Sequence, residues 1–460
     1  MLIATGFLFA YLAADALVPG AIAGEAADAL LNLSKQRRVL EAAVRTGDVV
    51  AARSAIDAIG KLDSLKGVQY LLTQAHICSD ELYAALVRAI PGSRDAAMKE
   101  MLAALYRTEA RKANGNWEHR VMLLDALATF SDEEVVPVFA LAAEDPHPKV
   151  RLAAVRRMHD AGVPVTRKIP VWIESLAAAE KALDLGTPHV EARTLLYRGT
   201  AEDFSDAKSW NAYWQANGRD FQPPDDPPED EIRLGDSAEY YGEAVTSRRI
   251  LFIVDTSGSM NILEQEEWPN LPQVPMGGAG GSGADGGGSP ITHPLWLQWI
   301  QRNPLSVRMA RAKAELARLI DQLPPNTLFN IVAFNSRTIP WQKTLTPVGP
   351  QSVASAKQFV ESLHHGGATA ADLALETAFH DNNLADTIYF LSDGEPSRDG
   401  VNLTPIPPLL EQVEQANRFH RIIINTLGFG AQGEPFMKAL AERNRGAYRR
   451  IVGPPTWQRP

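Results

Sequence analysis

Five residues in the second half of the chain carry side-chain oxygen in a pattern that suits a metal ion. Asp255, Ser257 and Ser259 occupy alternate positions directly after the apolar run 250–254. Thr369 follows a glycine pair, and Asp393 follows a second apolar run, 387–391. Hard cations such as Mg²⁺ and Ca²⁺ prefer carboxylate and hydroxyl oxygens as ligands. The spacing therefore predicts a divalent metal site assembled from three separate segments.

The elements that would position these residues are predicted from hydrophobic periodicity. From residue 249 onward, apolar runs of five to seven residues alternate with amphipathic stretches. The predicted strands are 250–254, 328–334, 387–391, 422–427 and 447–452, and the predicted helices are 306–323, 351–363, 370–380, 408–418 and 435–444. This alternation predicts an α/β fold with a doubly wound, mostly parallel sheet. Ligands of such sheets bind beyond the carboxyl ends of the strands, where the oxygen-bearing residues lie.

Residues 248–453 resemble a von Willebrand factor type A (VWA) domain. The signature of that family is Asp-x-Ser-x-Ser, then a Thr, then an Asp, and this sequence matches it in order with Asp255, Ser257, Ser259, Thr369 and Asp393. The stretches 329–334, 389–394 and 424–430 fit the same family. The resemblance implies a metal-ion-dependent adhesion site in which the three hydroxyls contact the metal directly and the two carboxylates act largely through water. It further implies that the cation, Mg²⁺ or else Ca²⁺ or Mn²⁺, keeps one position for an Asp or Glu of a protein partner.

The stretch 261–305 is an insertion relative to that family. It contains the glycine-rich run 277–288, which is typical of flexible coil, and the apolar residues Trp268, Trp296, Leu297, Trp299 and Ile300. Because the insertion begins beside the predicted metal site, it is expected to be either a lid or recognition arm, or a disordered excursion. The segment 296–300 either packs on the domain or contacts a partner.

Residues 25–220 show almost no strand pattern and are predicted to be helical. The clearest unit, 132–162, has helix patterns on both sides of a turn at 145–148, and Pro188-His189-Val190 resembles its Pro148-Lys149-Val150 start 40 positions later. These features resemble HEAT-type repeats, which implies stacked helix pairs that serve as a scaffold or a second binding surface. A helical bundle without regular repeats is the alternative. Four aromatic residues are predicted to cap the last repeat: Phe204, Trp210, Tyr213 and Trp214.

Two other stretches help to delimit the domains. Residues 221–247 read as an acidic, proline-rich linker followed by a short edge strand at 239–245. Residues 1–23 resemble a secretory signal peptide, with an uncleaved anchor and an ordinary first helix as alternatives. A signal peptide would place the protein in the periplasm or outside the cell, and its absence would place it in the cytoplasm.

The composition narrows the function further. A net charge of −10 argues against a nucleic-acid partner, and the single cysteine, Cys78, excludes an internal disulfide and is expected to be buried. Neither a nucleophile-elbow Gly-x-Ser-x-Gly at a strand end nor a phosphate-binding Gly-x-x-x-x-Gly-Lys-Ser/Thr motif occurs. A phosphotransferase that used Asp255 as its nucleophile would usually need a second acidic residue two positions later, and this chain has Ser257 there. His364 and His365 are expected to be exposed.

The favoured function is therefore non-enzymatic, metal-dependent protein binding of the adhesion type. The first alternative is a cytoplasmic accessory or adaptor protein of a larger assembly, such as an AAA+ ATPase. A remote alternative is a Mg²⁺-dependent hydrolase.

Overall fold

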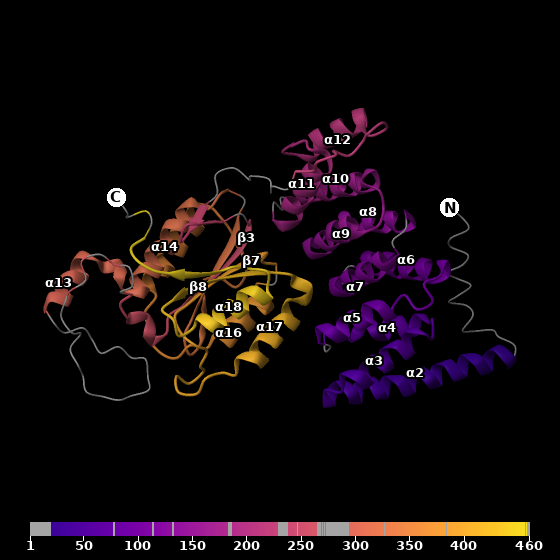
Figure 1. Ribbon diagram of the computed structural model, residues 1–460, viewed down its shortest axis with the longest axis horizontal. Coiled ribbons are helices and arrows are strands. Elements are labelled where there is room, and N and C mark those ends of the chain that lie inside the picture. Colours follow the sequence, from indigo (N-terminus) through magenta and orange to yellow (C-terminus); the bar gives the residue numbers. More distant parts are fainter. Residues whose placement is uncertain are drawn as a thin grey trace. The chain divides into compact units, whose positions relative to one another are not determined.

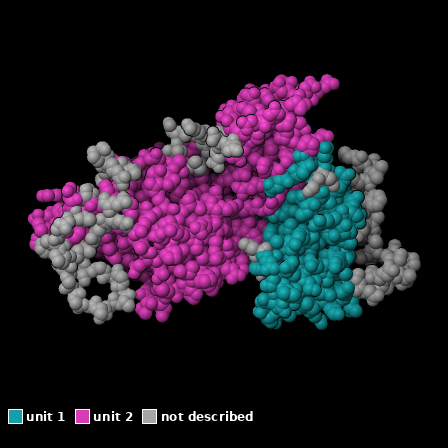
Figure 2. All heavy atoms as spheres, in the orientation of Figure 1, with its two compact units in different colours: residues 1–138, 160–163 teal, residues 139–159, 164–460 magenta. Residues whose placement is uncertain are grey.

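The computed structural model describes residues 20–76, 79–112, 115–130, 133–182, 186–228, 238–245, 247–264, 268, 270, 272, 294–325, 327–382, 384–455 and 457. Three sequence predictions lie outside these residues: most of the signal peptide, the burial of Cys78 and the glycine-rich run 277–288. Contacts divide the chain into two compact units, which Figure 2 colours separately. Unit 1 comprises residues 1–138 and 160–163, and unit 2 comprises 139–159 and 164–460. The domain boundary expected at 221–247 stays a prediction.

The first half of the chain is helical, as its sequence predicts (Figure 1). Its helices are α2 (Gly20–Thr46), α3 (Val49–Gly60), α4 (Leu65–Thr73), α5 (Asp80–Ala89), α6 (Ala96–Arg111), α7 (Trp117–Leu127), α8 (Val136–Ala143), α9 (Pro148–Asp160), α10 (Val165–Lys181), α11 (Thr187–Thr200) and α12 (Ala207–Asn217). Each of α3 to α7 follows a residue whose side-chain oxygen accepts a backbone N–H of the first turn: Asp48, Ser64, Ser79, Asp95 and Asn116. Such caps satisfy donors that the helix itself leaves unpaired.

The turn between α8 and α9 lies where the sequence places it. Asp145 Oδ1 accepts the backbone N–H of His147 at 2.9 Å, and Arg151 Nη1 donates to the backbone carbonyl of Asp145 at 2.8 Å. Neighbouring helices also pack on one another, for example α2 on α3, α6 on α7, and α10 on α11. These contacts confirm helix pairing, while membership in the HEAT class stays a prediction. No helix in the described part of the chain is both long and apolar enough to cross a membrane.

The aromatic residues near the end of the helical region form the predicted cap. Trp210 is fully buried, and its ring lies 4.9 Å from that of Phe204 in an edge-to-face arrangement. These rings share a hydrophobic cluster with Trp172 of α10 and Leu196 of α11. Phe221, at the start of the linker, packs against Trp214 with a ring distance of 5.4 Å. The first linker residue is therefore anchored on the last helix.

The second half forms a mixed, mostly parallel sheet (Figure 1). Its strands are β3 (Arg249–Asp255), β4 (Leu328–Phe334), β5 (Thr338–Pro340), β6 (Thr346–Pro347), β7 (Thr387–Ser392), β8 (Ile423–Phe429) and β9 (Tyr448–Ile451). The spatial order is β5-β4-β3-β7-β8-β9, with β6 also paired to β4. β3 pairs in parallel with β4 on one side and β7 on the other, while β5 and β6 are antiparallel. The chain reverses its direction of winding at β3, and ligands of such sheets bind beyond the carboxyl ends of the strands at this point of reversal.

Helices cover both faces of this sheet, each over its own hydrophobic core. On one face, α14 (Arg308–Gln322) and α15 (Pro350–Ser362) pack over side chains such as Phe252 and Phe329. On the other face, α16 (Ala371–Asp381), α17 (Ile406–His420) and α18 (Glu434–Arg443) pack over Ile253 and Phe390. Every residue of β3 is buried, which explains the unbroken apolar run 250–254 within it.

The prediction of a single edge strand at 239–245 is wrong. This segment makes a separate antiparallel hairpin, β1 (Ala238–Tyr240) and β2 (Glu243–Val245). Tyr241 and Gly242 have φ angles of 51° and 81°, which a two-residue hairpin turn of this kind requires. Tyr240 and Val245 are buried in the core under α14, so the apolar pattern reflects packing on the sheet domain and not pairing with its edge.

Candidate metal centre

Asp255 is the last residue of the central strand, and its carboxylate is fully buried. Parallel pairing aligns Asp255 with Phe334 at the end of β4 and Val254 with Leu391 near the end of β7. The carboxyl ends of three adjacent strands therefore meet at one edge of the sheet. Asp393 directly follows β7, so this register brings the two predicted carboxylates to the same place.

Backbone hydrogen bonds hold the loop after β3 against the glycine pair. Gly366 N donates to Thr256 O at 2.8 Å, and Gly258 N donates to Gly367 O at 3.0 Å. Gly367 has a φ of 82°, a conformation in which a side chain would be strained, and a Cβ there would lie 2.8 Å from Ser336 Oγ. A glycine at 367 thus allows the two loops to lie against each other.

The Thr369 segment is tied in a similar way to the loop after Asp393. Thr369 and Ser397 exchange two backbone hydrogen bonds, of 3.0 and 2.9 Å. A methyl group added to Gly394 would lie 3.6 Å from Thr369 Oγ1, so this hydroxyl lies next to the residue that follows Asp393. The third predicted segment is thus part of the same cluster.

Direct hydrogen bonds join the side-chain oxygens of three predicted ligands, Ser257, Ser259 and Asp393. Ser257 Oγ and Ser259 Oγ are 3.0 Å apart, and Ser259 Oγ donates to Asp393 Oδ1 at 2.7 Å. Asp255 Oδ1 accepts the backbone N–H of Ser257 at 2.7 Å, and Asp255 Oδ2 accepts the hydroxyl of Ser392 at 2.5 Å. The structure therefore brings together all five residues that the sequence singles out.

The electrostatics of this cluster favour a bound cation. Burial, and then repulsion from Asp393, raises the pKa of Asp255, while hydrogen bonds from Ser392 and Ser257 oppose that rise. Among the described residues, Asp255 makes no ion pair, whereas Asp393 pairs with Arg308 at 2.8 Å. A divalent cation would stabilise both ionised carboxylates at once. The residues present thus fit a hard cation.

Hydroxyl ligands would be essential to such a site. Within the described ranges, no group of three or more His, Cys, Asp or Glu side chains is arranged to hold a metal. The donor set of two carboxylates and three hydroxyls contains only oxygen, which suits Mg²⁺, Ca²⁺ or Mn²⁺ better than a softer metal. His364 and His365 are exposed, as predicted, and His364 Nδ1 lies 2.5 Å from the carbonyl of Ser362.

Three residues of this centre have no counterpart in the sequence prediction: Ser392, Arg308 and Glu264. Ser392 is the last residue of β7 and directly precedes Asp393, so its position at the strand end was the one available signal. Arg308 begins α14, and no motif marks it. Glu264 lies in the predicted insertion, and its role emerges only from its contacts with Arg308 and Gly430.

The two ends of the insertion meet beside the metal centre. Leu263 and Val307 form an antiparallel bridge, flanked by hydrogen bonds from Glu264 N to Ser306 O and from Arg308 N to Ile262 O. Helix α13 (Pro294–Arg302) buries Trp296 and Trp299 in a cluster with Leu263 and Trp268. Of the two alternatives for segment 296–300, the structure shows packing within the protein.

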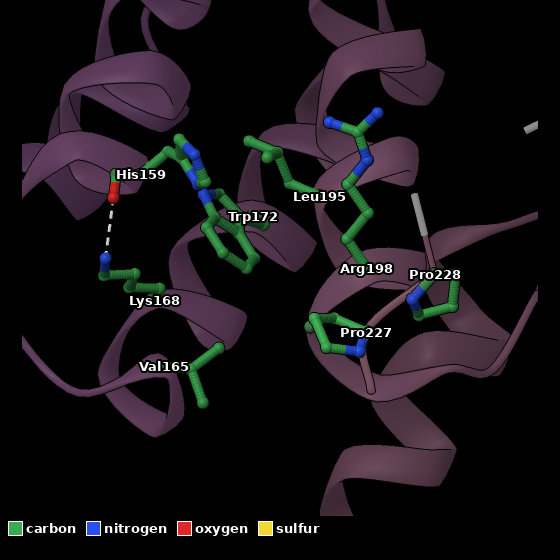
Figure 3. Close-up of a pocket in the computed structure, with 9 residues that line it drawn as sticks. His159, Val165, Lys168, Trp172, Leu195, Arg198, Pro227 and Pro228 are labelled. Carbon is green, nitrogen blue, oxygen red and sulfur yellow. Dashed lines mark hydrogen bonds between the residues drawn. The ribbon is translucent and has the colours of Figure 1, made fainter. Parts of the chain in front are cut away.

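A separate cavity of about 460 Å³ lies among the helices of unit 2 (Figure 3). It is lined by Trp172, Leu195, Arg198, Lys168 and other residues of α9 to α11, and by the linker residues Pro227 and Pro228. Lys168 Nζ donates to the backbone carbonyl of His159 at 2.6 Å, the bond drawn in Figure 3. The cavity shares no residue with the metal centre and is not part of that site.

Comparisons with known proteins agree with this fold. Residues 305–450 match the family model of the von Willebrand factor type A domain. The chain is 27% identical over 159 residues to inter-alpha-trypsin inhibitor heavy chain H2 of Mus musculus, covering 32% of this chain and 16% of that protein. It is 28% identical over 131 residues to von Willebrand factor A domain-containing protein 3B of Homo sapiens, covering 28% of this chain and 9% of that protein. The chain therefore spans less than a fifth of the length of these relatives.

Solved structures give fainter matches. A von Willebrand factor type A protein from Catenulispora acidiphila aligns with a TM-score of 0.31 and 20% identity, covering 45% of this chain and 39% of that one. Proximal thread matrix protein 1 from the mussel byssus, solved with a zinc-occupied MIDAS motif, aligns with a TM-score of 0.28 and 16% identity, covering 44% and 41%. These scores are too low to add to the assignment.

The sheet order and the two helix layers are those of a doubly wound α/β fold. The chain contains a von Willebrand factor type A domain, preceded by a helical region.

Proposed function

We propose that this protein binds a partner protein through a divalent cation held by Asp255, Ser257, Ser259, Thr369 and Asp393. The observation that carries the proposal is the hydrogen-bonded chain from Ser257 Oγ through Ser259 Oγ to Asp393 Oδ1. It joins side chains from two loops that are 134 residues apart, and backbone bonds bring the Thr369 segment against both. Capped turns alone would not require oxygen-bearing side chains from separate loops to converge.

In this proposal the two kinds of ligand have different tasks. The hydroxyls of Ser257, Ser259 and Thr369 hold the cation directly, and the carboxylates of Asp255 and Asp393 balance its charge, largely through water. When bound, the cation supplies an open coordination position for a carboxylate oxygen. Mg²⁺ is the favoured ion, with Ca²⁺ or Mn²⁺ as alternatives, because every donor is oxygen.

The exposure of the loops supports recognition of a protein side chain. Gly258 is exposed, and Ser259, Gly394 and Glu395 are partly exposed, while Asp255 beneath them is fully buried. The site thus lies at the surface, where an Asp or Glu of a partner protein would reach it. We propose adhesion by shared coordination, without a catalytic role.

The proposal also covers the helical region and the N-terminal segment. The helical region 25–220 acts as a scaffold or a second interaction surface, and its HEAT-like repeats would provide an extended binding face. Residues 1–23 act as a signal peptide, so the protein works in the periplasm or outside the cell. A tagged chain recovered from intact cells would test this, because export predicts a mature N-terminus near residue 24.

Affinity capture under two conditions tests the adhesive role. Wild-type protein would capture partners in Mg²⁺ and release them in a chelator, while Asp255→Ala would capture none of these partners in either buffer. Lys357→Met, which removes an exposed cation from α15, serves as the control and should behave as wild type. The same partners in every lane would contradict metal bridging.

A further inference from the structure

Arg308 pairs directly with one carboxylate of the proposed site. Its Nη1 donates to Asp393 Oδ2 at 2.8 Å, while Ser259 Oγ donates to the other oxygen, Oδ1, at 2.7 Å. The side chain of Asp393 is completely buried and that of Arg308 is only 13% exposed. Both oxygens of Asp393 are therefore held, and a fixed positive charge lies at the edge of the cation site.

Glu264 partly balances that charge from the opposite side. Glu264 Oε2 lies 3.4 Å from Arg308 Nη2 and accepts the backbone N–H of Gly430 at 3.1 Å. Gly430 has a φ of 64°, and a Cβ there would lie 2.8 Å from Arg308 Nη2. The left-handed backbone at position 430 favours glycine, and a larger residue there would crowd the guanidinium of Arg308.

The positions of both charged residues are set by the bridge at the two ends of the insertion. Glu264 N and Arg308 N each donate to the facing segment, at 2.8 and 3.1 Å. The backbone of both residues is therefore held by hydrogen bonds, and both side chains are largely buried, with Arg308 13% and Glu264 7% exposed.

We propose that Arg308 and Glu264 form a charge pair that sets the cation affinity of this site and its preference for an acidic partner. This inference rests on the proposed metal-binding function. The guanidinium repels the cation and so weakens its binding, and Glu264 offsets part of that repulsion. Once the cation is bound, the same guanidinium adds to the attraction for a carboxylate ligand. Arg308 is in this sense a specificity-determining residue that also positions Asp393.

Two charge-neutralising variants should shift cation affinity in opposite directions. Arg308→Gln keeps an N–H donor for Asp393 but removes the repulsion, so its Kd for Mn²⁺ should fall by roughly tenfold. Glu264→Gln leaves the arginine uncompensated, so its Kd should rise several-fold. Arg308→Lys keeps the charge and should remain within about threefold of wild type. Calorimetric titration of Mn²⁺ into the full chain measures all three.

The second readout is the binding of a simple carboxylate to the loaded site. Acetate titrated into the Mn²⁺-loaded protein displaces metal-bound water and lowers the water-proton relaxation rate. We expect acetate to bind Arg308→Gln several-fold more weakly than wild type, even though the metal binds more tightly. A residue that only supports the fold would weaken both kinds of binding together.

The outcomes separate this inference from the function on which it rests. If wild type binds no Mn²⁺, the proposed function fails and the charge pair fails with it. If wild type binds Mn²⁺ but the Gln variants at 308 and 264 leave its Kd unchanged or shift it in the same direction, the charge-pair inference alone is overturned. Thermal unfolding without metal identifies a variant that fails to fold. If one of the two Gln variants fails to fold, the direction of the change in Kd of the other, compared with Arg308→Lys, tests the inference.

Discussion

Ser259 Oγ lies 2.7 Å from Asp393 Oδ1, although the two residues are 134 positions apart in the chain. The contact exists because β3 and β7 are parallel neighbours and end at the same edge of the sheet. Each of the two loops that follow these strands contributes one residue to this hydrogen bond. This hydrogen bond directly joins two of the proposed metal ligands.

Loss of this hydroxyl should affect cation binding more than folding. Ser259→Ala removes a proposed ligand and the hydrogen bond to Asp393, so the affinity for Mg²⁺ should fall at least about tenfold. Because Ser259 is partly exposed, the free energy of unfolding without metal should fall by only about 1 kcal/mol. Ser362→Ala, which removes a hydroxyl at the exposed end of α15, is the control. Equal metal affinities of the two variants would count against Ser259 as a ligand.

Close packing of two loops makes Gly433 sensitive to substitution. A Cβ at Gly433 would lie 2.6 Å from the backbone carbonyl oxygen of Gly394, which follows Asp393. Gly433→Ala should therefore lower the free energy of unfolding by about 2 kcal/mol. At Gly258 a Cβ would meet its nearest neighbour at 3.6 Å, so Gly258→Ala should fold like wild type. Chemical denaturation of both variants checks this difference, and equal stabilities would show that the loops do not pack this closely.

The central sheet could be predicted because its strands are buried on both faces. β3, β4 and β7 have nearly continuous apolar sequences, and their observed bounds differ from the predicted ones by at most one residue at either end. The meeting of Asp255 and Asp393 at one place could be predicted because the strand ends of a parallel sheet share an edge. The antiparallel strands β5 and β6 are too short, at three and two residues, to produce a recognisable period.

The charged surroundings of the site could not be predicted in the same way. Arg308 meets Asp393 across 85 positions, and Glu264 meets Gly430 across 166. Side-chain pairs of this kind depend on the path of loops that have no hydrophobic period. The hairpin β1–β2 was missed for a related reason, since its apolar residues pack under α14 instead of joining the sheet.

Removing one partner of a buried ion pair within unit 2 should lower stability strongly. Lys149 Nζ lies 3.2 Å from Asp386 Oδ1, both side chains are 1% exposed, and Thr187 N donates to Asp386 Oδ2 at 2.9 Å. Burial lowers the pKa of Lys149, and Asp386 opposes that change. Lys149→Met would leave the Asp386 carboxylate buried without its cation, at a cost of about 3 kcal/mol of unfolding free energy.

An exposed pair provides the comparison for that substitution. Lys357 and Asp321 lie 2.6 Å apart, but their side chains are 41% and 52% exposed. Lys357→Met should change stability by less than about 1 kcal/mol. Urea unfolding of both variants measures the difference, and similar losses would show that the Lys149 pair is hydrated in solution.

Acid should destabilise the region around His189. Burial, together with the charges of Arg193 and Arg248, lowers the pKa of His189 from its ordinary 6.5 to about 4, although Glu180 lies 3.8 Å away. Between these values the unfolded chain binds the proton and the folded chain does not, so stability falls as the pH falls through this window. From pH 7.5 to pH 5 the loss attributable to His189 should be about 1–2 kcal/mol.

Replacing His189 isolates its share of the pH dependence. His189→Gln should unfold with a smaller loss of stability between pH 7.5 and pH 5 than wild type. His365→Gln, at an exposed loop position, should retain the full loss. Urea unfolding at the two pH values makes the comparison, and an unchanged pH dependence in His189→Gln would show that this imidazole is protonated in the folded protein.

The most direct test of the metal centre is calorimetric titration of Mg²⁺ into the full chain and into Asp255→Ala. Asp255 is the buried carboxylate whose raised pKa the cation would reverse, so its removal should abolish the site. The predicted result is saturable binding of one Mg²⁺ per wild-type chain and no saturable binding to a folded Asp255→Ala variant. Absence of saturable binding by wild type, or equal binding by both proteins, would contradict the assignment.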